Sequence, residues 1–114
     1  MRRDDLYLTD MQEAAKKVVA IVGNRTRADW QSDFVLVDAT IRNLQVIGEA
    51  ARSVSDGTRA LAPEIEWKRL VGLRNILVHQ YFGLDEDIVW DLATNRCLEL
   101  DEQLVALLER LERS

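Results

Sequence analysis

The chain has 114 residues, 47% of them hydrophobic, which is enough for one domain (residues 1–114) whose core needs no disulfide or metal. Its 15 basic and 20 acidic residues give a net charge of −5, which argues against broad coating of nucleic acid but allows a local basic site. The lone Cys97 and the absence of any zinc-type spacing predict a reducing, cytoplasmic setting and no metal or cofactor. Apolar runs reach only about five residues, so no membrane span is expected.

Two long helices are predicted in the first half of the chain. Residues 4–22 carry an apolar stripe with steps of three and four, and Gly23 ends this helix. Residues 26–33 form a connector with room for one helical turn, and residues 33–53 form the second helix. The stripes are Leu8, Met11, Ala15, Val18 and Val22 in the first helix, and Phe34, Val37, Ile41, Leu44, Gly48 and Ala51 in the second. Gly48 costs about 1 kcal/mol against Ala inside a helix, so it predicts a close backbone approach.

The second half predicts two more helices. Ser55-Asp56-Gly57 indicates a turn, and Pro63 favours a third helix that begins near residues 63–66 and ends at Gly83. Asp85 would cap a fourth helix over residues 85–111, with a seam of Ala93, Cys97, Leu100, Leu104, Leu107 and Leu111. Because no window alternates with period two, we expect an all-α protein, an antiparallel bundle of four to five helices. The three tryptophans are expected to be packing anchors rather than base-stacking platforms.

The third helix carries the only histidine, His79, within the stretch from Leu73 to Tyr81. Arg74 offers a permanently charged fork for phosphate oxygens, and His79 titrates in the physiological range. On an ideal helix Lys68, Gly72, Asn75 and His79 fall along one strip, with Gly72 making a hollow in it, whereas Arg74 lies about 140° from His79 and must curl back. Tyr81 would point away from His79 unless the helix loosens before Gly83.

RNA cleavage by transesterification needs a base, an acid and positive charge on the phosphorane. One histidine cannot hold both protonation roles at once, so two copies related by a two-fold axis would supply two His79 and two Arg74 to one cleft. Positive potential is then expected in a cleft formed by Lys68, Arg69 and Arg74. The alternative on spacing alone is a histidine that contacts helix-end carbonyls and an arginine in a surface pair.

Residues 74–81 match the pattern R-N-x-x-x-H-x-Y, which resembles the R-x(4–6)-H signature of the HEPN superfamily in its HepT-type toxins. Ile47-Gly48-Glu49-Ala50 and the approach from Trp67 also resemble that family, and the similarity spans essentially the whole chain. The resemblance implies a HEPN-like helical bundle that forms a homodimer, with both Arg/His segments lining a shared cleft. Many such proteins are metal-independent ribonucleases.

The resemblance also implies roles and partners. Arg74 would stabilise the phosphorane, His79 would transfer protons, and Asn75 would orient His79 or the phosphate. Tyr81 would be the site at which a MntA-like nucleotidyltransferase antitoxin adds AMP. Glu49 and Arg42 are possible neighbours of the cleft.

We therefore expect the toxin of a type VII-like toxin–antitoxin system, an endoribonuclease acting on tRNA or mRNA, with no DNA or membrane partner. The alternative is a non-catalytic helical module that docks a minimal nucleotidyltransferase and presents a substrate. A purely structural helical dimer is a third hypothesis.

Overall fold

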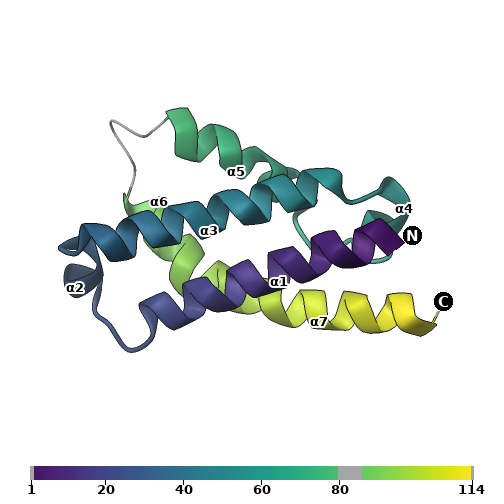
Figure 1. The fold of residues 1–114 in the computed structure, drawn as a ribbon, viewed down its shortest axis with the longest axis horizontal. Helices are drawn as coiled ribbons and strands as arrows, with labels where there is room; N and C mark the ends of the chain where they lie inside the picture. The colour runs from purple at the N-terminus through teal and green to yellow at the C-terminus, as the bar shows by residue number, and fades with distance from the viewer. Residues whose placement is uncertain (1, 80–85, 114) are drawn as a thin grey trace.

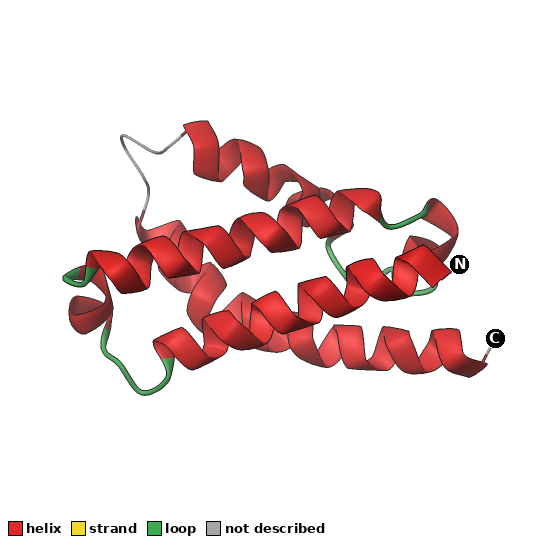
Figure 2. Ribbon diagram, in the orientation of Figure 1, coloured by secondary structure: helices red, strands yellow, loops and turns green. Residues whose placement is uncertain are grey.

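The computed structural model describes residues 2–79 and 86–113, and these residues are helical with short loops and no strand (Figure 2). The four long helices are α1 (Arg2–Val22), α3 (Phe34–Ser53), α5 (Trp67–His79) and α7 (Cys97–Arg113). Three short helices, α2 (Arg27–Gln31), α4 (Asp56–Ala60) and α6 (Glu86–Asp91), and a π-helical segment, η1 (Leu92–Arg96), complete the described chain. The expected all-α bundle is confirmed.

The bundle is built around α1, which packs against both α3 and α7, while α5 packs on α3 (Figure 1). In Figure 1, α3 and α5 run in opposite directions, and both chain ends lie at the end of the bundle that α4 occupies. Every member of the predicted α1 stripe is buried, and α1 begins at Arg2, two residues before the predicted start. Among the described residues, no helix combines the length and the apolar character needed to cross a bilayer.

The predicted stripe of α3 is confirmed except at its first residue, and Val37 and Ile41 are partly buried against the core. Leu44, Gly48 and Ala51 are buried, but the side chain of Phe34 is 75% exposed. The reason lies in α2, where Trp30 is fully buried and its Nε1 donates a hydrogen bond of 3.0 Å to Oγ1 of Thr40. The fully buried Thr40 lies about 120° around the helix from Phe34, so Phe34 is on a different face of α3.

The tryptophans are packing anchors, as predicted. The rings of Trp30 and Trp90 lie with their centroids 5.3 Å apart, tilted by 47°. Nε1 of Trp67 donates a hydrogen bond of 3.0 Å to the carbonyl oxygen of Ala62. Each buried indole N–H thus has a partner, which is the usual condition for burying this polar group.

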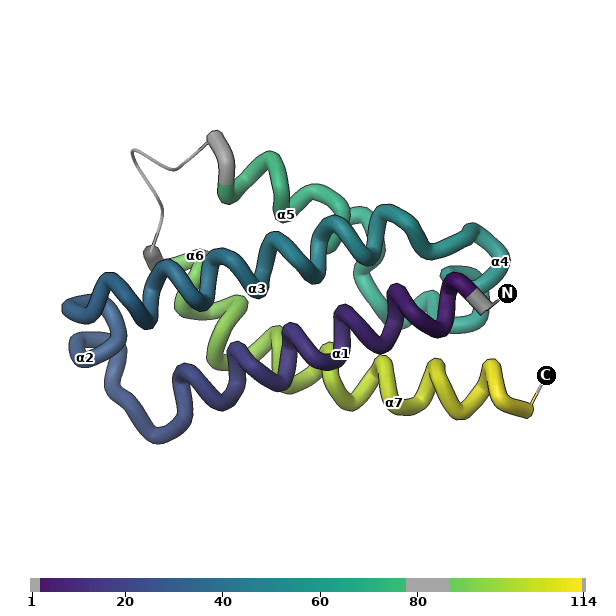
Figure 3. The backbone as a smooth tube through the Cα atoms, viewed as in Figure 1, coloured from purple at the N-terminus to yellow at the C-terminus, as the bar shows by residue number. Residues whose placement is uncertain are grey.

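The predicted single helix over residues 85–111 is interrupted. Its seam is buried as expected, with Leu111 half-buried, but residues Leu92–Arg96 form a π-helix between α6 and α7. Oγ1 of Thr94 donates a hydrogen bond of 2.7 Å to the carbonyl oxygen of Trp90, a contact that commonly bends helices. The chain changes direction there, as the backbone tube shows (Figure 3).

The connection between α3 and α5 also differs from the prediction. Instead of a simple turn, Ser55 caps the short helix α4 by accepting a hydrogen bond from the amide of Thr58. The buried carboxylate of Asp4 accepts hydrogen bonds from the amide and hydroxyl of Ser55 and from the hydroxyl of Thr58, at 3.1, 2.6 and 2.6 Å. Pro63 lies in a turn, and α5 begins at Trp67 rather than at residues 63–66. Gly83 and Asp85 lie outside the described residues.

Candidate functional site

The helices α3 and α5 meet at Gly48. A Cβ atom added to Gly48 would lie 3.0 Å from the carbonyl oxygen of Leu70, 3.4 Å from Cβ of Leu73 and 3.6 Å from the amide nitrogen of Arg74. The predicted close backbone approach is confirmed. Because the contact includes the backbone of Arg74, it fixes the place from which this side chain leaves α5.

Beside this contact lies an open groove of about 530 Å³. Its walls are Gly48, Glu49, Arg52 and Ser53 on α3 and Val71, Arg74 and Asn75 on α5. The groove therefore contains two of the predicted site residues, Arg74 and Asn75, both of them exposed. It also contains Glu49, whereas Arg42 lies on the same exposed face of α3, two turns before it and outside the groove.

The charges in the groove are available to a ligand. Within the described residues, no ion pair or side-chain hydrogen bond engages Arg52, Arg74 or Glu49. Two guanidinium groups and one carboxylate leave a local excess of positive charge on a protein that is acidic overall. Guanidinium groups bind phosphate through paired N–H donors, so the groove is suited to a phosphate-containing ligand.

The predicted basic cleft is only partly right. Lys68 is exposed near the start of α5, but Nη1 of Arg69 lies 3.0 Å from Oε2 of Glu66, the residue directly before α5. Arg69 lines a separate, largely apolar pocket of about 150 Å³ between α5, η1 and α7. The second arginine of the groove, beside Arg74, is therefore Arg52 and not Arg69. The signal that could have revealed Arg52 is its position one helical turn after Gly48.

The structure leaves part of the predicted site untested. His79 is the last residue of α5, one turn after Asn75, but its side chain lies outside the described residues, as does all of Tyr81. Along the predicted strip, Lys68 and Asn75 are exposed, and a Cβ atom on Gly72 would meet nothing within 4 Å. The grouping of Arg74, Asn75 and His79 into one catalytic set therefore stays a prediction, and so does the two-fold dimer.

The described residues hold no group of three or more His, Cys, Asp or Glu side chains arranged to bind a metal ion. The thiol of Cys97 is buried in the core, and burial raises its pKa to about 12, so Cys97 is a packing residue as predicted. Among the described residues, those of the groove offer a ligand charged groups and hydrogen-bond donors.

This architecture defines a small α-helical protein with a groove between two helices that carries an excess of positive charge. The chain belongs to the ribonuclease HepT-like family, whose model matches residues 11–107. It is 39% identical to "Putative RNase MJ0125" of Methanocaldococcus jannaschii over 93% of this chain and 91% of that one. It is 36% identical to "Putative RNase MJ1380" of the same organism (75% and 79%) and 33% identical to "Probable ribonuclease HepT" of Thermococcus cleftensis (74% and 76%). No solved structure matches significantly.

The family match confirms the resemblance to HepT-type HEPN proteins that the stretch from Arg74 to Tyr81 indicates. The match includes both walls of the groove and the whole of that stretch. The extent of the domain beyond residues 11–107 is not covered by the match and stays a prediction.

Proposed function

We propose that this protein is the toxin of a toxin–antitoxin pair, a cytoplasmic endoribonuclease that cleaves RNA without a metal ion at a site shared by two copies of the chain. The observation that carries the proposal is the pair Arg74 and Asn75, exposed and free to bind in the groove where α5 meets α3 at Gly48. Membership of the ribonuclease HepT-like family supports the same activity.

In the proposed reaction the 2′-hydroxyl of a ribose attacks the neighbouring phosphate. One His79 takes the 2′-hydroxyl proton and the His79 of a second copy protonates the leaving 5′-oxygen. Arg74 stabilises the negative charge that develops on the phosphorane, and Asn75 orients His79 or the phosphate. The products are a 2′,3′-cyclic phosphate and a free 5′-hydroxyl, and no co-reactant is consumed.

The proposed control of this activity acts at Tyr81. A nucleotidyltransferase antitoxin transfers AMP from ATP to the phenol oxygen and releases pyrophosphate. The added phosphate is a bulky anion close in sequence to Arg74 and opposes binding of an RNA phosphate there. A Tyr81→Phe variant should therefore escape silencing by the antitoxin, and full silencing of this variant would contradict the proposed modification site.

The central test compares His79→Ala and Arg74→Ala with the wild type in a cleavage assay on RNA, with EDTA present, alongside circular dichroism and size-exclusion chromatography. Both variants should stay folded and dimeric and lose cleavage, and Arg113→Ala, an exposed arginine at the end of α7, should cleave at the wild-type rate. A folded His79→Ala dimer that cleaves RNA as fast as the wild type overturns the proposal. Stoichiometric binding to the nucleotidyltransferase without any cleavage would instead indicate the non-catalytic docking module.

A further inference from the structure

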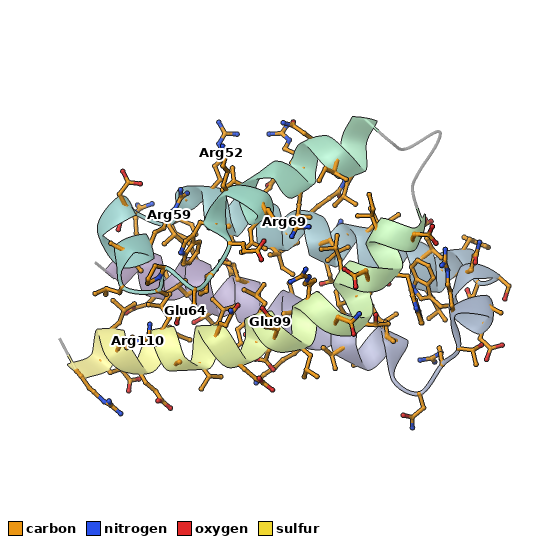
Figure 4. All side chains as sticks on the ribbon, turned by 180° about the vertical axis from the view of Figure 1, so that it is seen from behind. Arg52, Arg59, Glu64, Arg69, Glu99 and Arg110 are labelled. Carbon is orange, nitrogen blue, oxygen red and sulfur yellow. The ribbon has the colours of Figure 1, made fainter. Side chains whose placement is uncertain are left out.

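Arg52 is the second arginine of the groove, and its side chain has no partner among the described residues. Most other described arginines are engaged: Arg27, Arg69, Arg96 and Arg110 in ion pairs, and Arg25 and Arg59 on backbone carbonyls. In Figure 4 the Arg52 side chain projects outward from the end of α3, on the side where α5 lies. We infer that Arg52 binds a second RNA phosphate, next to the one at Arg74, and so positions the substrate strand in the groove. This inference rests on the proposed ribonuclease function.

The backbone that carries Arg52 is held in place. Nη2 of Arg59 donates hydrogen bonds to the carbonyl oxygens of Ala51 and Arg52, at 2.9 and 3.3 Å. The guanidinium carbon of Arg59 also lies 5.9 Å from the ring centroid of Trp67, the first residue of α5. Arg59 thereby ties the last turn of α3 to the start of α5. A binding group on such a fixed backbone loses less conformational freedom when it meets its ligand.

The spacing of the two arginines fits neighbouring phosphates. Gly48 approaches the amide of Arg74, and Arg52 follows Gly48 by four residues, about 6 Å along the helix axis. A nucleic-acid strand rises about 3.4 Å per nucleotide in a duplex, so this offset corresponds to one or two nucleotides. The two arginines can therefore contact different phosphates of one strand.

The helix packing places Arg52 and His79 on opposite sides of Arg74. Because α3 and α5 are antiparallel (Figure 1), the end of α3 that carries Arg52 lies beside the start of α5, whereas His79 is at the end of α5. Arg52 therefore sits on the side of Arg74 away from His79. It would contact a phosphate that does not react, so we assign it to substrate positioning rather than to the chemical step.

The first measurement is RNA affinity across a series of salt concentrations. Fluorescence anisotropy with a labelled single-stranded oligoribonucleotide uses His79→Ala as the background, so that no cleavage disturbs the titration. Adding Arg52→Ala should weaken binding roughly tenfold, the scale of one lost hydrogen bond to a charged group. It should also reduce the slope of log K against log salt by about 0.7, the value for one phosphate contact on a single strand. Arg52→Lys should keep most of the slope, and Arg113→Ala should change nothing.

The second measurement separates positioning from the chemical step. A dinucleoside monophosphate has only the scissile phosphate, so Arg52→Ala should cleave it at the wild-type rate while kcat/KM on a ten-nucleotide RNA falls about tenfold. An unchanged salt slope, or an equal loss on both substrates, overturns the inference. If no cleavage is seen at all, the proposed function fails, and the anisotropy titration still decides the role of Arg52. Absence of RNA binding by the His79→Ala protein overturns both.

Discussion

Replacing Gly48 by alanine tests whether the contact between α3 and α5 is as tight as the structure has it. The new methyl group would lie 3.0 Å from the carbonyl oxygen of Leu70, closer than side-chain carbons normally come, so α5 must move by a few tenths of an ångström. Overpacking of this kind costs about 1–3 kcal/mol. Alanine regains up to about 1 kcal/mol of helix propensity. We expect a net loss of about 1 kcal/mol in the free energy of unfolding.

Gly72 supplies the matched control, because it is also a glycine inside one of these two helices but lies outside their contact. A Cβ atom on Gly72 meets nothing within 4 Å, so Gly72→Ala should gain about 0.5–1 kcal/mol from propensity alone. Urea and thermal unfolding followed by circular dichroism should separate the two variants by about 2 kcal/mol, roughly 8 °C in Tm. If Gly48→Ala is stabilised as much as Gly72→Ala, the close approach is not real and the argument for the groove fails with it.

Three further predictions concern the core. Burial alone would raise the pKa of Asp4, but hydrogen bonds from Ser55 and Thr58 lower this pKa below the usual 3.8. Its contribution to stability is therefore fully present above pH 3.8 and is lost as the pH falls through the lowered native pKa. Asp4→Asn should flatten the fall of the unfolding free energy with decreasing pH in this acid range. Thr40→Val leaves the buried indole N–H of Trp30 unpaired and should cost about 1–3 kcal/mol in urea unfolding; a neutral result would contradict this hydrogen bond. Cys97, with its pKa raised to about 12, should react with a thiol reagent only after unfolding, and fast labelling of the native protein would show that it is not buried.

The sequence predicts the fold well wherever local pattern and burial agree. The stripe of α1 and the seam ending in α7 are correct because each is set by a long run of apolar residues at helical spacing. The close approach of α3 and α5 at Gly48 is predictable because a glycine in a helical seam has few explanations other than close packing. The errors come from contacts between distant segments. Phe34 is exposed, and Trp30 from α2 is buried against α3 instead. The spacing of apolar residues within α3 carries no information about this contact.

The same limit applies to the site. Arg74 and Asn75 were identified from a short motif, and the structure places both in the groove. The position of Arg52 one turn after Gly48 is a sequence signal for the groove. Excluding Arg69, however, depends on the rotation of α5 against α3 and on the ion pair of Arg69 with Glu66, which the sequence does not show. Likewise, the π-helix between α6 and α7 contains a side-chain hydrogen bond of Thr94 that hydrophobic spacing does not predict.

The packing of α5 against α3 has a mechanical consequence. Arg59 and Trp67 hold its start, and Leu77 packs its second half into the core, so a side chain added at the Gly48 contact would tilt the helix between these points. From Leu73 to His79 the helix extends about 9 Å, and a tilt of about 10° would displace its end by about 1.5 Å. Misplacement on the order of 1 Å can slow an enzyme by about a hundredfold. If His79 acts as proposed, substitutions at the α3–α5 crossing would lower the rate of RNA cleavage while leaving the chain folded.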